Sequence, residues 1–266
     1  MGRLAETFER VARDRRKAYI GYVMAGFPSA EGAQALAQGL LERGADILEL
    51  GVPFSDPIAD GVVIQQAGEK ALAAGGGLAG TLDLARRLRA VASQPLVLMS
   101  YLNPLLSMGL ETFCHGAKVA GVDAVVVPDL PPEEAGQLSA LCKGAGLDLV
   151  LLAAPTSTPA RLKAIAKAAT GFIYVVSVAG VTGERKAFDQ RLRGVVAELR
   201  RHSKAPLAVG FGISSPETAR EAASMADGAV VASTVLKLFL DQGGGPDALA
   251  AALDKAQGLI QAVHAA

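Results

Sequence analysis

Disulfides, membrane spans and metal sites each lack the residues that they require in this sequence of 266 residues. The two cysteines, Cys114 and Cys142, are too few for a disulfide framework. No apolar run reaches the roughly 20 residues of a membrane-spanning helix, and the first residues carry too many charges for a signal core. The three histidines lie far apart, without the spacing of zinc ligands. These absences indicate a soluble, cytoplasmic protein with no metal.

An excess of charge of either sign is also absent, because 26 Lys and Arg residues balance 26 Asp and Glu residues. This balance gives no basic surface for nucleic acid or for an anionic membrane. A local basic run at 13–17 is interpreted as a solvated helix end. We therefore expect neither nucleic acid nor membrane as a partner.

Short apolar segments alternate with longer amphipathic segments along the whole chain. The expected strands are 18–24, 46–50, 96–101, 123–127, 147–153, 171–176, 206–211 and 227–232. They are almost continuously apolar, which is typical of parallel strands buried on both faces. The expected helices are 30–43, 62–74, 80–92, 110–119, 132–144, 158–169, 189–202, 216–224 and 246–264, with a further helix at 2–16.

Eight strands that are each followed by a helix predict an α/β fold, a (β/α)8 TIM barrel with an extra N-terminal helix. No Pro/Gly/Ser-rich linker divides the chain, so residues 1–266 are expected to form a single barrel domain. The structural alternative is a doubly wound open sheet. In a barrel, the active site lies where the strands end.

The second expected strand and the loop after it contain two candidate catalytic carboxylates. Glu49 lies between Leu48 and Leu50, so alternation places it on the opposite face from both. If that face points into the barrel mouth, desolvation raises its pKa and makes it a general acid. Asp60 lies in the following loop, where the two acids could share one site. The alternatives are a solvated strand-end carboxylate for Glu49 and an acidic surface turn for Asp60.

The later strand ends offer other groups. The polar connection 177–186 after the sixth strand is interpreted as a lid or binding loop. Small residues at 210–215 and 231–234 precede helix starts and favour phosphate binding by backbone N–H groups. No expected strand contains the lysine that a Schiff-base aldolase uses. Carbon–carbon cleavage here would therefore depend on acid–base catalysis alone.

Five motifs occur in a fixed order: ELGVPFSDPIADG at 49–61, YLNP at 101–104, PDLP at 128–131, GVTG at 180–183 and GFGIS at 210–214. Together they resemble the tryptophan synthase α-subunit family, and the resemblance spans about residues 8 to 260. It implies a TIM-barrel lyase that performs retro-aldol cleavage of indole-3-glycerol phosphate to indole and D-glyceraldehyde 3-phosphate. It implies no cofactor in this chain. The implied partner is a β subunit that contains pyridoxal phosphate, in an α2β2 heterotetramer that makes L-tryptophan.

The resemblance also implies roles for individual residues. Glu49 would protonate the indole ring carbon, and Asp60 would bind the indole N–H. Tyr174 would position Glu49, and Thr182 would bond Asp60 when the lid closes. The expected indole pocket consists of Tyr22, Met99, Tyr101 and Phe211. The expected phosphate site consists of Gly183, Gly212, Ala232 and Ser233.

A partner surface is implied in the same way, by Pro53, Phe54, Asp56, Pro57, Asn103, Asp129 and Pro131. Pro53, Phe54, Pro57 and Ile58 would place apolar side chains on a solvent-facing loop, which suits a covered surface. The alternative is that Phe54 and its neighbours pack inward. The sequence departs from the usual family pattern at Phe27, Val62, Val178 and Ala232.

Three other functions stay open at this stage. The chain could be a stand-alone lyase that releases free indole, or a barrel that only activates a partner. An isomerase of phosphoribosyl anthranilate is a further enzyme of this fold class. It is disfavoured because Glu49 and Asp60 lie on one strand-and-loop unit rather than on separate strands.

Overall fold

A computed structural model describes residues 2–176, 190–210 and 212–266, in which eight parallel strands close into a barrel. Each strand pairs with the next one along the chain, and β1 closes the barrel against β8. The strands are β1 (Ala18–Met24), β2 (Ile47–Gly51), β3 (Leu96–Met99), β4 (Ala124–Val126), β5 (Asp148–Ala153), β6 (Ile173–Val176), β7 (Leu207–Gly210) and β8 (Gly228–Val231). The predicted barrel is confirmed and the open sheet is excluded, because such a sheet leaves its edges unpaired.

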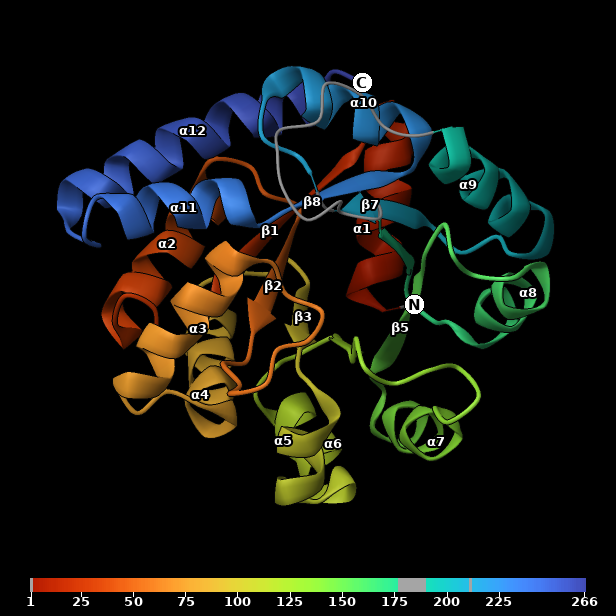
Figure 1. Ribbon diagram of the computed structural model, residues 1–266, viewed down its shortest axis with the longest axis horizontal. Helices are drawn as coiled ribbons and strands as arrows, with labels where there is room; N and C mark the ends of the chain where they lie inside the picture. Colours follow the sequence, from red (N-terminus) through yellow and green to blue (C-terminus); the bar gives the residue numbers. More distant parts are fainter. Residues whose placement is uncertain (1, 177–189, 211) are drawn as a thin grey trace.

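The described residues form twelve helices. They are α1 (Arg3–Arg13), α2 (Ala30–Glu42), α3 (Val62–Ala73), α4 (Leu78–Arg89), α5 (Leu102–Met108), α6 (Leu110–Val119), α7 (Gly136–Ala145), α8 (Pro159–Ala168), α9 (Gln190–His202), α10 (Pro216–Met225), α11 (Ser233–Asp241) and α12 (Pro246–His264). Figure 1 shows α2 to α12 in a ring around the strands, with α1 inside that ring. None of the helices in the described ranges is long and apolar enough to cross a membrane.

Three details differ from the sequence prediction. The sequence predicted neither α5 nor α11. The start of α7 at 132 is wrong, because residues 132–135 form a turn in which the Glu134 N–H bonds to the Pro131 carbonyl. The other predicted helices and all the strands are confirmed, with small differences at their ends.

Two hydrophobic clusters divide the side chains by the face of the strand on which they lie. The larger cluster, which includes Leu48 and Leu50, fills the space between the barrel and the outer helices. The smaller cluster fills the barrel and includes Ile20, Ile47 and Val97, together with Leu4, Phe8 and Val11 of α1. The i, i+4, i+7 spacing of these α1 residues places them on one helix face. The N-terminal helix therefore closes the N-terminal end of the barrel.

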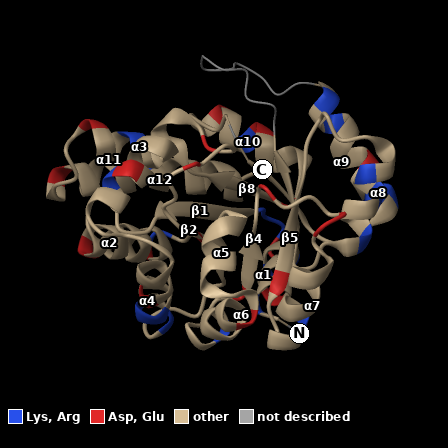
Figure 2. Cartoon of the chain, turned by 60° about the horizontal axis from the view of Figure 1, so that its bottom comes forward, with Lys and Arg blue, Asp and Glu red and all other residues tan. Residues whose placement is uncertain are grey.

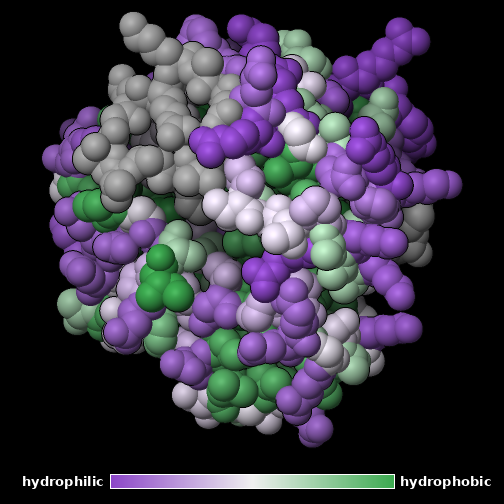
Figure 3. Space-filling view, turned by 45° about the vertical axis from the view of Figure 1, so that its right-hand side comes forward, coloured by the Kyte–Doolittle hydropathy of each residue, from purple (hydrophilic) through white to green (hydrophobic). Residues whose placement is uncertain are grey.

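Charged residues lie mainly on the outer helices, with both signs interspersed (Figure 2). On the face shown in Figure 3, hydrophilic side chains cover most of the surface and apolar ones form small separate groups. Scattered apolar residues of this kind are ordinary on a protein surface.

A repeated interaction holds the N-terminal ends of the strands together. Three strands begin directly after an aspartate that accepts the N–H at the start of the preceding strand. The pairs are Asp46 with Tyr19 at 3.0 Å, Asp123 with Leu96 at 2.9 Å, and Asp227 with Leu207 at 2.8 Å. An arginine pairs with each carboxylate, namely Arg16, Arg89 and Arg200. Because charge-assisted hydrogen bonds are the strong ones, these contacts fix the end of the barrel away from the expected active site.

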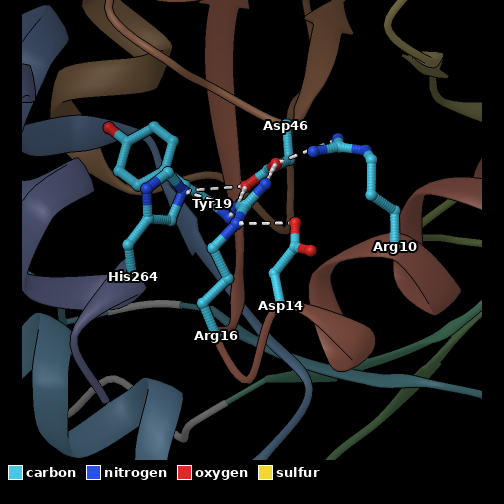
Figure 4. A network of polar contacts seen from close by, with 6 residues as sticks. All are labelled: Arg10, Asp14, Arg16, Tyr19, Asp46 and His264. Atoms are coloured by element: carbon cyan, nitrogen blue, oxygen red, sulfur yellow. Dashed lines mark hydrogen bonds and ion pairs between the residues drawn. The ribbon is translucent and has the colours of Figure 1, made fainter.

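Asp46 joins the most elements, as Figure 4 shows. Its carboxylate contacts Arg16 at 2.8 Å, His264 of α12 at 2.9 Å and Arg10 of α1 at 3.3 Å. Burial alone would raise the pKa of Asp46, but hydrogen bonds from His264, Arg16 and the Tyr19 N–H lower it to about 2. One carboxylate thus links the first helix, the first two strands and the last helix.

We expect Asp46→Asn to destabilise the protein in a pH-dependent way. Because the folded-state pKa lies below the usual value of 3.8, this carboxylate stabilises the fold above about pH 4. The contribution is about 2 kcal/mol and is lost as the pH falls from about 4 to about 2. Urea unfolding of both proteins should show a deficit at pH 7 that shrinks at pH 2.5. Asp254→Asn, which removes an exposed ion pair with Arg43, is the control. An equal deficit at both pH values would contradict this account.

Candidate active site

A pocket opens at the C-terminal ends of the strands, opposite the aspartate contacts. Its lining comprises Tyr22, Glu49, Asp60, Gly61, Ile64, Met99, Tyr174, Gly212, Ile213, Val230, Ala232 and Ser233. Eight of these were expected from the sequence, and the structure brings them to one place although they come from six strands and their loops. Thr182, Gly183 and Phe211, like Val178, lie outside the described residues.

No individual role was predicted for four lining residues, Gly61, Ile64, Ile213 and Val230, although Gly61 and Ile213 lie in the segments 49–61 and 210–215. Three of them are aliphatic residues of the kind that fill any core, so their type carries no sign of a site. Gly61 follows Asp60 directly and Ile64 lies four residues after it, so proximity to that acid is a signal that could have found them. The apolar character of these four lining residues makes the pocket a low-dielectric space around its polar groups.

Glu49 points into the barrel mouth from the middle of β2. It is 1% exposed, whereas its neighbours Leu48 and Leu50 pack in the outer cluster. Its Oε2 atom has no hydrogen-bond partner within the described part of the chain. Burial, followed by the charge of Asp60, raises the pKa of Glu49 to about 8. The solvated alternative for Glu49 is therefore wrong, and the group holds a proton at neutral pH.

Asp60 lies in the loop between β2 and α3, where two side chains hold it. Burial raises its pKa to about 6, although a hydrogen bond with Tyr101 acts in the opposite direction. The Tyr101 hydroxyl also accepts the Ala59 N–H at 3.0 Å, and Gln65 donates to the Asp60 carbonyl at 2.9 Å. Tyr101 was expected to line the indole pocket, but it is not among the lining residues and reaches the pocket through its hydrogen bond with Asp60. The two acids titrate apart, so at neutral pH one is protonated while the other is ionised.

Two tyrosines lie across the ends of neighbouring strands. Tyr22 is directly opposite Glu49 in the β1–β2 register, and its ring extends over Gly51. A Cβ atom at Gly51 would overlap the Tyr22 hydroxyl, and one at Gly210 would overlap the Tyr174 hydroxyl. Glycine at the last position of β2 and of β7 is therefore what lets both rings lie beside the acids.

Comparison with known proteins identifies the family in which this arrangement occurs. The family model of the tryptophan synthase alpha chain matches residues 8–264. The tryptophan synthase alpha chain of Geobacter sulfurreducens is 48% identical over 239 residues, which cover 90% of each chain. That of Phenylobacterium zucineum is 46% identical and covers 99% of this chain and 96% of its own.

Solved structures agree with this match. Tryptophan synthase subunit alpha from Legionella pneumophila is 35% identical, with a TM-score of 0.90 over 99% of this chain and 98% of its own. A chain of tryptophan synthase from Mycobacterium tuberculosis is 35% identical, with a TM-score of 0.91 over 99% and 98%.

The chain belongs to the tryptophan synthase alpha chain family. The known role of this family is cleavage of indole-3-glycerol phosphate, which makes this alpha chain a lyase of tryptophan biosynthesis. The alpha chain itself needs no cofactor, since pyridoxal phosphate belongs to the beta subunit, with which the family works.

Two helix N-termini at the pocket of this alpha chain differ in their capping. Ser215 and Thr218 form a capping box that satisfies the start of α10. The start of α11 has Ala232 at the N-cap and no side-chain hydrogen bond. Its first N–H groups are therefore available to an anion. Ala232, a departure from the family pattern, has φ −122°, so its side chain does not require a left-handed backbone.

The expected partner surface of the alpha chain is only partly exposed. The expectation that Pro53 faces solvent is wrong, because Pro53 is buried near Gly76. Phe54 is half-buried and stacks on Tyr101 with ring centroids 5.3 Å apart. Ile58 is 82% exposed. The loop therefore combines an inward anchor with an outward apolar tip.

The other surface residues that the sequence singled out have different positions. Asp56 and Asn103 are exposed, whereas Pro57 and Pro131 are half-buried. Asp129 accepts the Leu102 N–H at 3.0 Å and so caps α5.

Two departures from the family pattern also have a simple place in the fold. Val62 begins α3 with an exposed side chain, and Phe27 packs edge-on against Phe239 in the core.

We expect Gly51→Ala to reduce the catalytic rate at least tenfold, because the added methyl group displaces the Tyr22 ring from beside Glu49. The overlap should also destabilise the fold by about 1–3 kcal/mol. Thermal unfolding and steady-state rates check both effects. The double variant Gly51→Ala with Tyr22→Leu should recover stability but not activity. Gly68→Ala in α3, where a Cβ meets Met24 at an ordinary 3.5 Å, is the control. Wild-type activity in Gly51→Ala would refute the close-approach argument.

Proposed function

We propose that Glu49 and Asp60 perform the retro-aldol cleavage of indole-3-glycerol phosphate in this chain as a proton donor and a charge-stabilising carboxylate. The observation that carries this proposal is the separation of the two pKa values, about 8 for Glu49 and about 6 for Asp60, in one pocket. Near pH 7 only one protonation state dominates, with Glu49 neutral and Asp60 ionised. That state provides a proton and a negative charge at adjacent positions.

The reaction has two proton transfers at one carboxyl group. Glu49 protonates the indole carbon that bears the glycerol chain, which makes the ring a cationic electron sink. Asp60 stabilises the positive charge at the ring nitrogen, an effect that is large in a dry pocket. The Glu49 carboxylate then accepts the proton of the adjacent glycerol hydroxyl. The carbon–carbon bond breaks, its electron pair returns to the ring, and indole and glyceraldehyde 3-phosphate are released.

The remaining pocket residues bind the substrate. Tyr22, Met99 and Ile64 provide flat and aliphatic surfaces for the indole ring. Gly212, Ala232 and Ser233 lie beside the uncapped start of α11, where backbone N–H groups favour the phosphate. Thr182, Gly183, Phe211 and Tyr174 keep the roles that the family resemblance implies. A cytoplasmic location also remains a prediction, which rests on composition.

The beta subunit is proposed to dock on the loop that carries Phe54, Asp56 and Ile58, beside α5. Phe54 stacks on Tyr101, and the Tyr101 hydroxyl bonds both to the Ala59 N–H and to the Asp60 carboxylate. A partner that presses on this loop therefore acts on Asp60 through one aromatic side chain. Thermodynamic linkage then requires ligand in the pocket to strengthen partner binding by the same factor.

We expect kcat/KM to depend on pH with a bell shape, with limbs near pH 6 and pH 8 that belong to the coupled pair. The rate falls below pH 6 because Asp60 gains a proton, and above pH 8 because Glu49 loses one. Asp60→Asn should remove the acid limb and lower the rate. Glu49→Gln should reduce kcat by about 10²–10⁴-fold while glycerol phosphate still binds. A rate above a tenth of wild type in Glu49→Gln would exclude Glu49 as the essential acid.

Ile58→Asp should weaken binding of the beta subunit at least tenfold, because a charge would replace an apolar contact that binding desolvates. The affinity can be measured by titration calorimetry, and the stimulation of indole release by steady-state kinetics. Val119→Asp is the matched control, since Val119 is also exposed but lies at the C-terminal end of α6. Equal affinities for wild type and Ile58→Asp would place the partner elsewhere.

A further inference from the structure

A groove of about 530 Å3 lies at the N-terminal end of the barrel, away from the active site. It runs between α1 and the rim where α9 ends and where β7 and β8 begin. Its lining comprises Ala5, Phe8, Glu9, Val11, Ala12, Arg15, Arg16, Lys17, Arg200, Lys204, Pro206 and Asp227. This volume is large enough for a small aromatic molecule.

The floor of the groove is apolar. Ala5, Phe8 and Ala12 lie on one face of α1, and Pro206, directly before β7, adds to the apolar lining. Phe8 is held in place by Phe172 of the barrel interior, with ring centroids 5.9 Å apart. The floor is therefore part of the packed core and keeps its shape without a ligand.

The rim of the groove is positively charged, although the whole chain has a formal net charge of zero. Five of the lining residues are Lys or Arg, and two are acids. Three of the cations already have partners. Arg16 pairs with Asp46, Lys17 donates to the Ala226 carbonyl, and Arg200 pairs with Asp227.

Arg15 and Lys204 differ from these three. Both are exposed, and neither forms an ion pair or side-chain hydrogen bond with any residue in the described ranges. They come from two different parts of the groove lining, Arg15 from the segment after α1 and Lys204 from the segment after α9. Since the partners of the other cations already satisfy them, these two side chains are the groups that remain for an anion. Glu9, the second acid of the lining, is outnumbered by them.

The backbone of Arg15 gives an independent reason to assign it a function. Its φ is +54°, and it is the one non-glycine residue with positive φ among those described. The Arg15 and Arg16 N–H groups bond to the Ala12 and Val11 carbonyls, which is the hydrogen-bond pattern that ends helices with glycine. Arginine is strained in this conformation, and such outliers are enriched at functional sites. The chain thus places a cation at the groove where glycine would be more stable.

We propose that this groove binds a small carboxylate with an aromatic body, its ring on the floor of Phe8 and Pro206 and its carboxylate between Arg15 and Lys204. A simple inorganic anion would leave the apolar floor uncovered, and an uncharged aromatic would leave both cations without a partner. The ligand class follows from the combination of these two surfaces. The site is separate from the two acids of the pocket, so one molecule can bind both ligands.

The test uses 2-naphthoate as the probe and the full chain with its active site saturated by glycerol phosphate. Titration calorimetry should show one binding event that glycerol phosphate does not displace. Affinity should fall at least tenfold in Arg15→Gly and in Lys204→Ala, and should be retained in Arg15→Lys. Lys163→Ala removes the same charge from the exposed side of α8 and should have no effect. Uncharged 2-naphthalenemethanol should bind at least tenfold more weakly.

Arg15→Gly supplies a further readout that separates binding from folding. Because glycine favours positive φ, this variant should have a higher Tm than wild type while it loses the probe. The proposal is overturned if 2-naphthoate fails to bind at millimolar concentration or if glycerol phosphate displaces it. Equal binding by wild type, Arg15→Gly and Lys204→Ala, or equal binding of the charged and uncharged probes, would also overturn it.

Discussion

The burial of one carboxyl group, that of Glu49, is the constraint on which the pocket depends. Asp46 lies directly before β2, and Glu49 lies within this strand, three residues later. Nevertheless, the pKa of Asp46 is about 2 and that of Glu49 is about 8. Asp46 is surrounded by donors and cations, whereas Glu49 has an oxygen without a partner among the residues described. An unsatisfied buried polar group costs about 1–3 kcal/mol. The N-terminal end of the barrel therefore holds charged groups that are paired and hydrogen-bonded. Their contribution to stability offsets the cost of an acid without a partner at the C-terminal end.

The barrel could be predicted from the sequence because its strands are buried on both faces and are therefore almost continuously apolar. The two helices that were missed are the shortest of those described, with seven residues in α5 and nine in α11. A helix of two turns shows too few repeats of the apolar period to be recognised along the chain. The contact that holds the start of α5, from the Leu102 N–H to Asp129, joins residues 27 positions apart and forms only through the fold.

The residues of the candidate site likewise include some that the sequence indicates and others that only the fold reveals. Glu49 stands out in the sequence because a carboxylate is unusual inside an apolar strand. The alternation of side chains along the strand then indicates the face on which Glu49 lies. Ile64 and Val230 line the same pocket but are ordinary core residues, so only the fold distinguishes them. Pro53 was misplaced because the sequence gives no sign that the small residue Gly76 would leave room for it. Sequence patterns thus identify groups that are unusual for their position, and tertiary packing decides the rest.

The pocket must hold three acidic groups near one another when the substrate binds, namely two carboxyls and a phosphate. Each has a different physical solution in this structure. Glu49 is desolvated and therefore neutral, Asp60 keeps its charge through the Tyr101 hydroxyl, and the phosphate is expected at the uncapped N-terminus of α11. If the two carboxyl groups were left to solvent, their pKa values would converge at about 4 and Glu49 would lose its proton at neutral pH. The apolar walls are thus part of the acid–base chemistry, because they keep the two carboxyl groups in different protonation states.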